Sequence, residues 1–153
     1  MKLIVTKFGG TSVGTIDRIK SVATRIKNEV NNGYNVIVVV SAMAGETNRL
    51  IKLVESLTND YRTSEYDTVI SSGEQVTSGL LAIALNELGI KSKSYQGWQI
   101  PFETDKNFSK ANIKNIKKDK ILFDLKDDYV IVVPGFQGVY ENRITTLGRG
   151  GSD

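Results

Sequence analysis

The 153-residue sequence contains neither cysteine nor histidine. Without cysteine the chain has no disulfide framework, no thiolate nucleophile and no cysteine-based metal site. Without histidine it has no Ser-His-Asp triad, no phosphohistidine intermediate and none of the usual zinc ligands. Catalysis must therefore rely on lysine, arginine, carboxylates, hydroxyl groups or backbone amides, and we expect no metal bound by side chains of the protein.

Long apolar runs are also missing. The run at residues 36–40 is far too short to span a bilayer, and residues 3–5 are too few for the core of a signal peptide. With 40% apolar residues the chain can nevertheless bury a core, and its 24% charged residues argue against disorder. We therefore expect a cytoplasmic globular protein without a membrane partner.

The excess of positive charge is small. The net charge is +3, and much of the basic character lies in residues 106–126, where acidic residues are interspersed. No predicted helix combines a dense basic stripe with interleaved aromatic residues, which nucleic-acid binding would require. We interpret the lysine-rich segment as a solvated face and expect no nucleic-acid partner.

Hydrophobic periodicity predicts alternating strands and helices. Strands are expected at residues 2–6, 36–40, 90–95 and 129–133, and helices at residues 13–31, 48–57, 76–88 and 113–125. Residues 67–70 are expected to form a short segment leading into the third helix, and residues 97–109 to be irregular or hairpin-like. This alternation predicts one doubly wound α/β domain, with a mainly parallel sheet and helices on both faces.

Turns rich in small residues follow the predicted strands and the short segment. They lie at residues 9–10, 41–45, 73–74 and 135–138. In doubly wound folds, ligands bind outside the carboxyl ends of the parallel strands. We therefore expect these turns to converge on one binding site.

The first turn, KFGGTS at residues 7–12, has the composition of a phosphate-binding loop. Gly9 and Gly10 allow backbone amides to approach phosphate oxygens, and Lys7 supplies a positive charge. Thr11 and Ser12 add hydroxyl groups at a helix amino terminus, which favours anions. The alternative is a tight turn in which Thr11 or Ser12 is an ordinary N-cap. The segment is neither a P-loop nor a Rossmann fingerprint.

The segment KFGGTSV at residues 7–13 resembles the opening signature of aspartokinases within the amino-acid kinase family. Further matches follow in order: VSAMAGETN at residues 40–48, SGE at 72–74, PGFQG at 134–138 and TTLGRGGSD at 145–153. The resemblance spans the chain and implies the amino-terminal lobe of the amino-acid kinase fold. It also implies a transferase that uses ATP and Mg²⁺ to phosphorylate the β-carboxylate of L-aspartate, the first step towards lysine, threonine, methionine and diaminopimelate.

That reaction suits the residue types present. A carboxylate acceptor is already ionised at neutral pH, so no general base is needed and histidine is dispensable. Catalysis then consists of positioning and charge neutralisation.

The resemblance also implies roles for individual residues. Lys7 and Asp153 would be catalytic, and the phosphates of ATP would contact Lys7, Gly9, Gly10, Thr11, Ser12 and Ser41. Glu74 would pair with the α-ammonium of aspartate and Arg149 would hold a carboxylate, where its planar fork can bind two oxygens. Thr47, Phe136, Ser152 and Asp153 would line the rest of the pocket.

Simpler interpretations exist for three of these side chains. Glu74 could be a first-turn acid favoured by the helix dipole. Arg149 could be a flexible surface arginine between glycines, and Asp153 could be an N-cap.

Aspartokinases continue beyond the TTLGRGGSD segment. The resemblance therefore implies that the nucleotide-binding half and the regulatory domains are absent here, so that this chain by itself would show little activity. An apolar face left exposed would favour a homo-oligomer. Two other functions stay open: another amino-acid kinase, acting on glutamate or acetylglutamate, and a non-catalytic module that binds phosphate ligands.

Overall fold

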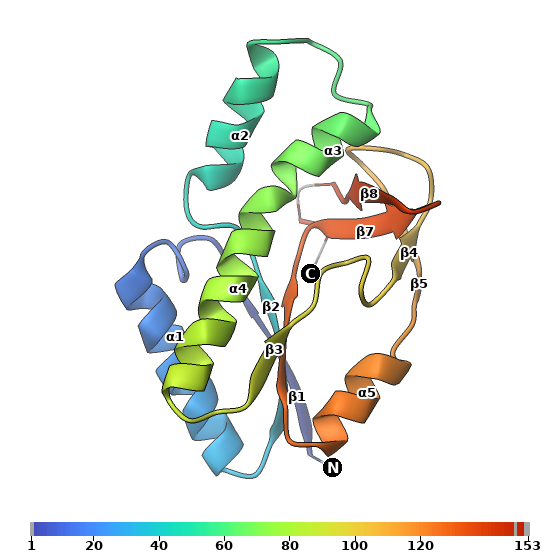
Figure 1. Ribbon diagram of the computed structural model, residues 1–153. Helices are drawn as coiled ribbons and strands as arrows, with labels where there is room; N and C mark the ends of the chain where they lie inside the picture. The colour runs from blue at the N-terminus through green and yellow to red at the C-terminus, as the bar shows by residue number, and fades with distance from the viewer. Residues whose placement is uncertain (1, 149, 152–153) are drawn as a thin grey trace.

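The computed structural model describes residues 2–148 and 150–151 (Figure 1). In chain order its elements are β1 (Leu3–Phe8), α1 (Ile16–Asn31), β2 (Asn35–Val40), α2 (Glu46–Glu55), α3 (Ser64–Ile70), α4 (Ser72–Glu87), β3 (Ser92–Ser94), β4 (Phe102–Thr104), β5 (Ile113–Ile116), α5 (Asp119–Lys126), β6 (Val130–Pro134), β7 (Gln137–Tyr140) and β8 (Arg143–Thr146).

The main sheet has the order β1-β2-β6-β3, and each of its strand pairs is parallel. Helices α1 and α4 lie on one face of this sheet and α5 lies on the other (Figure 1). The predicted doubly wound α/β fold is therefore confirmed. It brings the carboxyl ends of β1, β2 and β6 to one edge, below α2 and the amino-terminal end of α4.

Alternating side chains of the central strands build a core on each face. Val38 of β2 and Val132 of β6 are completely buried against α1 and α4. Ile131 points to the other face, where it packs with Leu125 of α5. Strands buried on both faces read as continuous apolar runs, which is why these two were identifiable from the sequence.

Helix α1 begins three residues later than predicted. Thr15 is its N-cap, and the Thr15 hydroxyl accepts a hydrogen bond from the Arg18 backbone N–H at 3.2 Å. Neither Thr11 nor Ser12 caps the helix, so the N-cap assignment in the simpler interpretation of the glycine turn is wrong. The Ser12 N–H instead donates to the Gly9 carbonyl at 2.9 Å, which closes the turn.

The predicted helix at residues 113–125 is wrong in its first half. Residues Ile113–Ile116 form β5, which pairs antiparallel with β4, and the helix begins only at Asp119. The spacing of Ile113 and Ile116 suits a helix, but both side chains are partly exposed in the strand. Pairing with β4 overrides the local pattern, as tertiary context commonly does. The segment at residues 67–70 is the end of α3, which begins after the N-cap Thr63.

A second sheet, of order β5-β4-β7-β8, covers the carboxyl edge of the main sheet at the upper right of Figure 1. Its β7–β8 hairpin turns at Glu141 and Asn142, both with positive φ. Gly138 of β7 must be a glycine, because a Cβ there would lie 2.4 Å from the Thr104 side chain and 2.7 Å from the Phe102 carbonyl oxygen. The sequence analysis did not predict this hairpin.

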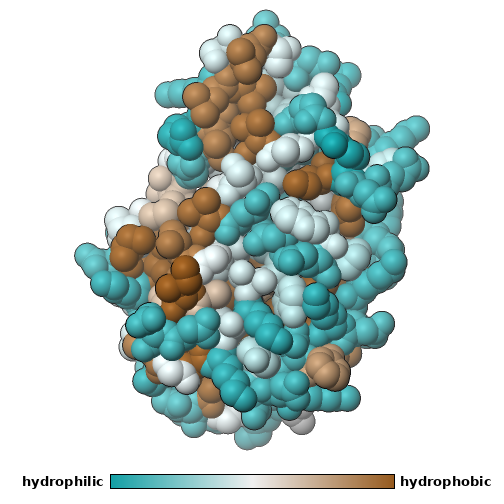
Figure 2. Space-filling view, viewed as in Figure 1, coloured by the Kyte–Doolittle hydropathy of each residue, from teal (hydrophilic) through white to brown (hydrophobic). Residues whose placement is uncertain are grey.

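Apolar side chains remain on the surface. Figure 2 shows them over α2 and over the α1–α4 side of the molecule, where Leu57, Val76 and Ile83 are exposed. On the edge strand β1, Leu3 and Val5 are 43% and 62% exposed. Across the described residues, none of the helices has both the length and the apolar character needed to cross a bilayer.

Candidate functional site

The turns rich in small residues converge on one site, as predicted from the sequence. They enclose a cavity of about 300 Å³ at the carboxyl edge of the main sheet. Six of the residues singled out in the sequence line it: Lys7, Gly10, Ser41, Thr47, Glu74 and Phe136. The remaining lining residues are Ala42, Met43, Ala44, Gly45, Asn48 and Gly150.

Close packing of two turns forms the floor of the cavity. Gly10 follows β1, and a Cβ at this position would lie 2.9 Å from the Ala42 carbonyl oxygen in the turn after β2. A side chain at Gly10 would therefore push the turns apart, whereas a Cβ at Gly9 meets nothing within 4 Å. The Ser41 N–H donates to the Phe8 carbonyl at 3.1 Å, which extends the pairing of β1 and β2 into the site.

Helix α2 points its amino terminus at the cavity. Gly45 precedes the helix with φ of 83°, a left-handed conformation that favours glycine, and allows the chain to turn sharply into Glu46. Thr47 and Asn48 in the first turn line the cavity. The positive end of the helix dipole favours an anion here.

Glu74 is the most unusual group of the site. It lies in the first turn of α4 and is only 3% exposed. Its Oε1 accepts a hydrogen bond from the Ala42 N–H at 3.1 Å, whereas Oε2 has no hydrogen-bond partner. Burial raises the pKa of Glu74 to about 7, although the backbone N–H groups of Ala42 and of Glu74 itself favour the ionised form.

The close approach of α4 explains this burial. A Cβ on Gly73 would lie 2.8 Å from the Cβ of Ala42, so only glycine lets the helix contact the turn after β2. Glu74 is therefore more than a first-turn acid favoured by its own helix. It is a buried acceptor shared between α4 and a neighbouring turn.

Phe136 also lines the cavity, from the connection between β6 and β7. Its φ is 66°, which costs a non-glycine residue roughly 1–2 kcal/mol. The Leu147 N–H holds it in place by donating to the Phe136 carbonyl at 2.8 Å. Strained backbone of this kind persists where the surrounding structure over-determines it, and it clusters at functional sites.

Some predicted residues are not brought to this cavity. Gly9, Thr11 and Ser12 do not line it. Ser12 lines an adjacent cavity of about 680 Å³ between β1 and α1, and Lys7 borders both. The Thr11 carbonyl accepts a hydrogen bond from Nη1 of Arg18. The predictions for Arg149, Ser152 and Asp153 fall outside the described residues, although the neighbouring Gly150 lines the cavity.

The sequence analysis missed the part played by Ala42. Its contribution is a backbone N–H aimed at Glu74, which no side-chain pattern could reveal. Met43, Ala44 and Asn48 were also not assigned to the site, although they belong to the VSAMAGETN segment.

The residues that line the cavity suit two kinds of ligand group. Lys7, the glycine turn and the amino terminus of α2 favour an anion such as phosphate. Glu74 offers a buried acceptor oxygen that suits a cation such as an ammonium group. Among the described residues, no group of three or more Asp, Glu, His or Cys side chains is placed to hold a metal ion.

Comparisons with known proteins agree with this chemistry. Residues 2–153 match the model of the Amino acid kinase family. An aspartokinase of Rickettsia felis is 53% identical over 157 residues, an alignment that covers 100% of this chain and 39% of that protein. The crystal structure of an aspartate kinase from Synechocystis superposes with a TM-score of 0.79 at 39% identity, covering 99% of this chain and 25% of that one.

A more distant structure shares the fold. It is aspartokinase III of E. coli in complex with aspartate and ADP, which superposes with a TM-score of 0.81 at 22% identity and covers 99% of this chain and 44% of that one. The chain thus spans well under half the length of the curated relative.

Proposed function

Because this chain belongs to the amino acid kinase family, we propose that it forms the amino-terminal part of an aspartate kinase domain. The reaction is transfer of the γ-phosphoryl group of ATP to L-aspartate. A β-carboxylate oxygen attacks the γ-phosphorus, the bond to the β-phosphate oxygen breaks, and 4-phospho-L-aspartate and ADP form. The names of the relatives support this choice within the family. The observation that carries it is the unpartnered Oε2 of Glu74 in the cavity wall.

Glu74 binds the α-ammonium group of aspartate in this proposal. A buried carboxylate with one unpartnered oxygen is costly by itself, and a bound cation removes that cost. The ammonium also favours the ionised form of Glu74, whose pKa is raised to about 7 by burial. Binding of aspartate should therefore strengthen as the pH rises through about 7, and below that pH it should release a proton.

Lys7 and the glycine turn hold the phosphate end. Lys7 borders both cavities, and so it can neutralise charge on the phosphoryl group between ATP and aspartate. Gly10 and Ser41 line the same wall, while Gly9, Thr11 and Ser12 approach the phosphates from the other side of the turn. Mg²⁺ accompanies the nucleotide and supplies further charge neutralisation when bound.

The remaining groups complete the proposal. Arg149 binds a carboxylate of the substrate, Ser152 and Asp153 contact the substrate, and Asp153 also takes part in catalysis. Thr47 and Phe136 shape the wall around the side chain of aspartate. The adenine and ribose contacts are assigned to parts of the longer relatives that this chain does not span. A cytoplasmic location and a place in lysine biosynthesis belong to the same proposal.

Calorimetric titration with L-aspartate and with succinate, which lacks the ammonium, tests the role of Glu74. The wild-type chain should prefer aspartate, and Glu74→Gln should lose that preference. A hydrogen bond to a charged group contributes about 1.5–3 kcal/mol, or roughly tenfold to a hundredfold in Kd. Glu46→Gln is the matched control, since Glu46 does not line the cavity and its carboxylate is already paired with Arg49 at 2.7 Å.

The same titration separates the alternatives. Tighter binding of N-acetyl-L-glutamate, which has no free ammonium, would contradict the assignment to aspartate. Nucleotide binding without any binding of aspartate would favour a phosphate-binding module. Aspartyl hydroxamate formation with Mg-ATP then measures turnover, which we expect to be small for this chain and lost in Lys7→Ala.

A further inference from the structure

Two buried polar side chains attach the β7–β8 hairpin to the junction between α3 and α4. Asp67 of α3 is completely buried, and it accepts hydrogen bonds from the N–H and the hydroxyl of Thr146 at 2.8 and 2.7 Å. Gln137 of β7 is 2% exposed, and its Nε2 donates to the Ser71 carbonyl at 3.3 Å. The Gln137 Oε1 accepts from the Gly97 N–H at 3.1 Å.

Both attachments lie at the same level of the hairpin. Gln137 and Thr146 are cross-strand partners. Phe136, which lines the cavity, directly precedes this pair. Glu74, which lines the same cavity, follows Ser71 by three residues. The two attachments therefore link two segments that line the site.

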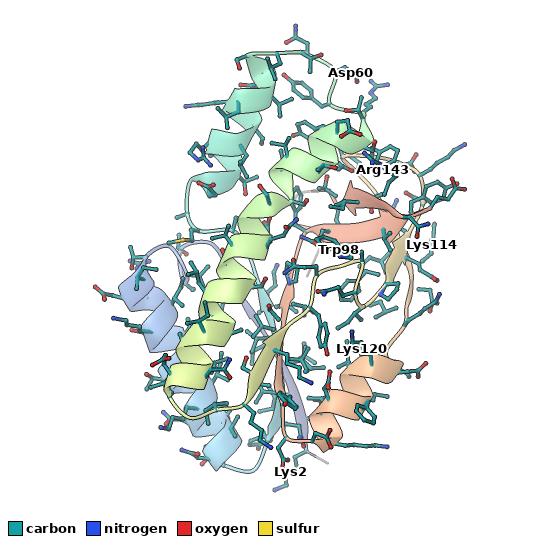
Figure 3. All side chains as sticks on the ribbon, viewed as in Figure 1. Lys2, Asp60, Trp98, Lys114, Lys120 and Arg143 are labelled. Atoms are coloured by element: carbon teal, nitrogen blue, oxygen red, sulfur yellow. The ribbon has the colours of Figure 1, made fainter. Side chains whose placement is uncertain are left out.

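The outer end of the hairpin is held differently. Arg143 lies beside the first turn of α3 (Figure 3), where it pairs with Glu65 and donates to the Ser64 hydroxyl at 3.1 Å. The side chains of this ion pair are 49% and 76% exposed, and exposed pairs of this kind contribute little. Among the side-chain contacts of the hairpin, the buried attachments at its base therefore hold it more firmly than this exposed pair.

Burying a carboxylate has a high cost in free energy, so stability alone does not explain Asp67. Taking a charge out of water costs several kcal/mol before hydrogen bonds offset the loss, and apolar replacements of buried charged groups are often neutral or stabilising. Asp67 also accepts the Ser109 N–H with both oxygens, each at 3.0 Å. Asp67 thus connects three segments of the chain beside the site: its own helix α3, the loop at Ser109 and strand β8. This favours a role in positioning these segments.

We propose that Asp67 and Gln137 are positioning residues, which fix the base of the β7–β8 hairpin on the α3–α4 junction and so set the separation of Phe136 and Glu74. This inference rests on the proposed function, in which that separation is the width of the aspartate pocket.

The first test compares Asp67→Asn with Asp124→Asn. Both oxygens of Asp67 face backbone N–H groups, so either orientation of an asparagine amide places an NH₂ against a donor. Asp124 is a matched control: it is 4% exposed, but it lies in α5, where it pairs with Lys93 at 2.8 Å. Both variants should lower the melting temperature. Only Asp67→Asn should also raise the Kd for L-aspartate, about tenfold or more, since a misplacement of about 1 Å can cost a hundredfold.

A second readout does not depend on aspartate. The carboxyl ¹³C signal of Glu74, followed by NMR through a pH titration, reports its burial directly. In Asp67→Asn the midpoint should fall towards 4.5, whereas in Asp124→Asn it should stay near that of the wild type. Variants of Thr146, the hydrogen-bond partner of Asp67, provide a test even if Asp67→Asn fails to fold. Thr146→Val should shift the midpoint of the Glu74 titration partly. Thr146→Ser, which keeps the hydroxyl, should restore the wild-type midpoint.

The outcomes distinguish this inference from the proposed function. If the wild type does not bind aspartate but the Glu74 midpoint shifts only in the Asp67 and Thr146 variants, the positioning role stands and the substrate assignment falls. If Asp67→Asn leaves both the midpoint and the Kd unchanged, or if Asp124→Asn changes them equally, the positioning role is overturned.

Discussion

At the scale of single residues, the buried carboxyl group of Glu74 makes the stability of the chain depend on pH. The pKa of Glu74 is raised by burial from 4.5 to about 7. The folded chain therefore holds this proton more tightly than the unfolded chain. The resulting stabilisation is fully present below pH 4.5 and is lost as the pH rises through 7, a change of about 3 kcal/mol in the free energy of unfolding.

Urea denaturation of the wild type and of Glu74→Gln across this range measures the effect. The wild type should lose stability between pH 4.5 and 7 by more than the variant does, because glutamine carries no proton to lose. Glu46→Gln should keep the wild-type slope. Parallel curves for the wild type and Glu74→Gln would show that the carboxyl is solvated.

The glycine turn offers a second comparison between single residues. Gly10→Ala brings a Cβ to 2.9 Å from the Ala42 carbonyl oxygen, whereas Gly9→Ala brings it to open space. Overpacking typically costs about 1–3 kcal/mol, so Gly10→Ala should lower the free energy of unfolding by that amount. Gly9→Ala should change it much less. Equal thermal melting curves for the two variants would contradict the close packing of these turns.

Among the elements, helix α4 contributes side chains both to the hydrophobic core and to the candidate site. Its buried side faces the sheet with Leu81 at 0% exposure, while Ile83 on the outer side is 60% exposed. Leu81→Ala should lower the free energy of unfolding by about 2–5 kcal/mol, because it removes a fully packed side chain and leaves a cavity.

Ile83→Ala in the same helix is the control for this change. It removes a comparable side chain from the exposed side, so the loss of free energy should be well below that of Leu81→Ala. Chemical denaturation of the two variants at one pH makes the comparison. Similar losses would mean that the outer side of α4 is covered in solution.

Individual elements also show which parts of the fold could be predicted from the local sequence pattern. The apolar runs of β2 and β6 and the periodic helices α1 and α4 were predicted, because burial on a sheet imposes their spacing. The segment that became β5 was assigned to a helix, because its pairing partner β4 lies in a segment that was expected to be irregular or hairpin-like. The β7–β8 hairpin was not predicted, since its turn residues Glu141 and Asn142 adopt positive φ without a glycine.

At the scale of the whole molecule, the edge of the main sheet is open. Val5 of β1 is in register with Ile37 of β2, and so it points to the face that α5 covers further along the sheet. It is nevertheless 62% exposed. Exposed apolar edge strands are templates for pairing with another chain.

We therefore expect concentration-dependent self-association through β1. Sedimentation velocity over a range of concentrations should show dimers or larger species, and Val5→Lys should shift them towards monomer. Leu57→Lys, at a residue 88% exposed at the end of α2, should have little effect. A wild-type chain that sediments as a monomer at all concentrations would count against this expectation.

The sequence by itself determined the family, the α/β fold and the position of the glycine turn after β1. These depend on consecutive residues or on short periodicities, and the parallel topology then brings the strand ends to one edge. The tertiary structure alone decided that Glu74 is buried with an unpartnered oxygen, that Phe136 lines the same cavity with a positive φ, and that Asp67 and Gln137 attach the β7–β8 hairpin beside them. The hydrogen bonds of Glu74, Gln137 and Asp67 join residues 32 to 79 positions apart, and their geometry exists only once the sheets and helices have packed.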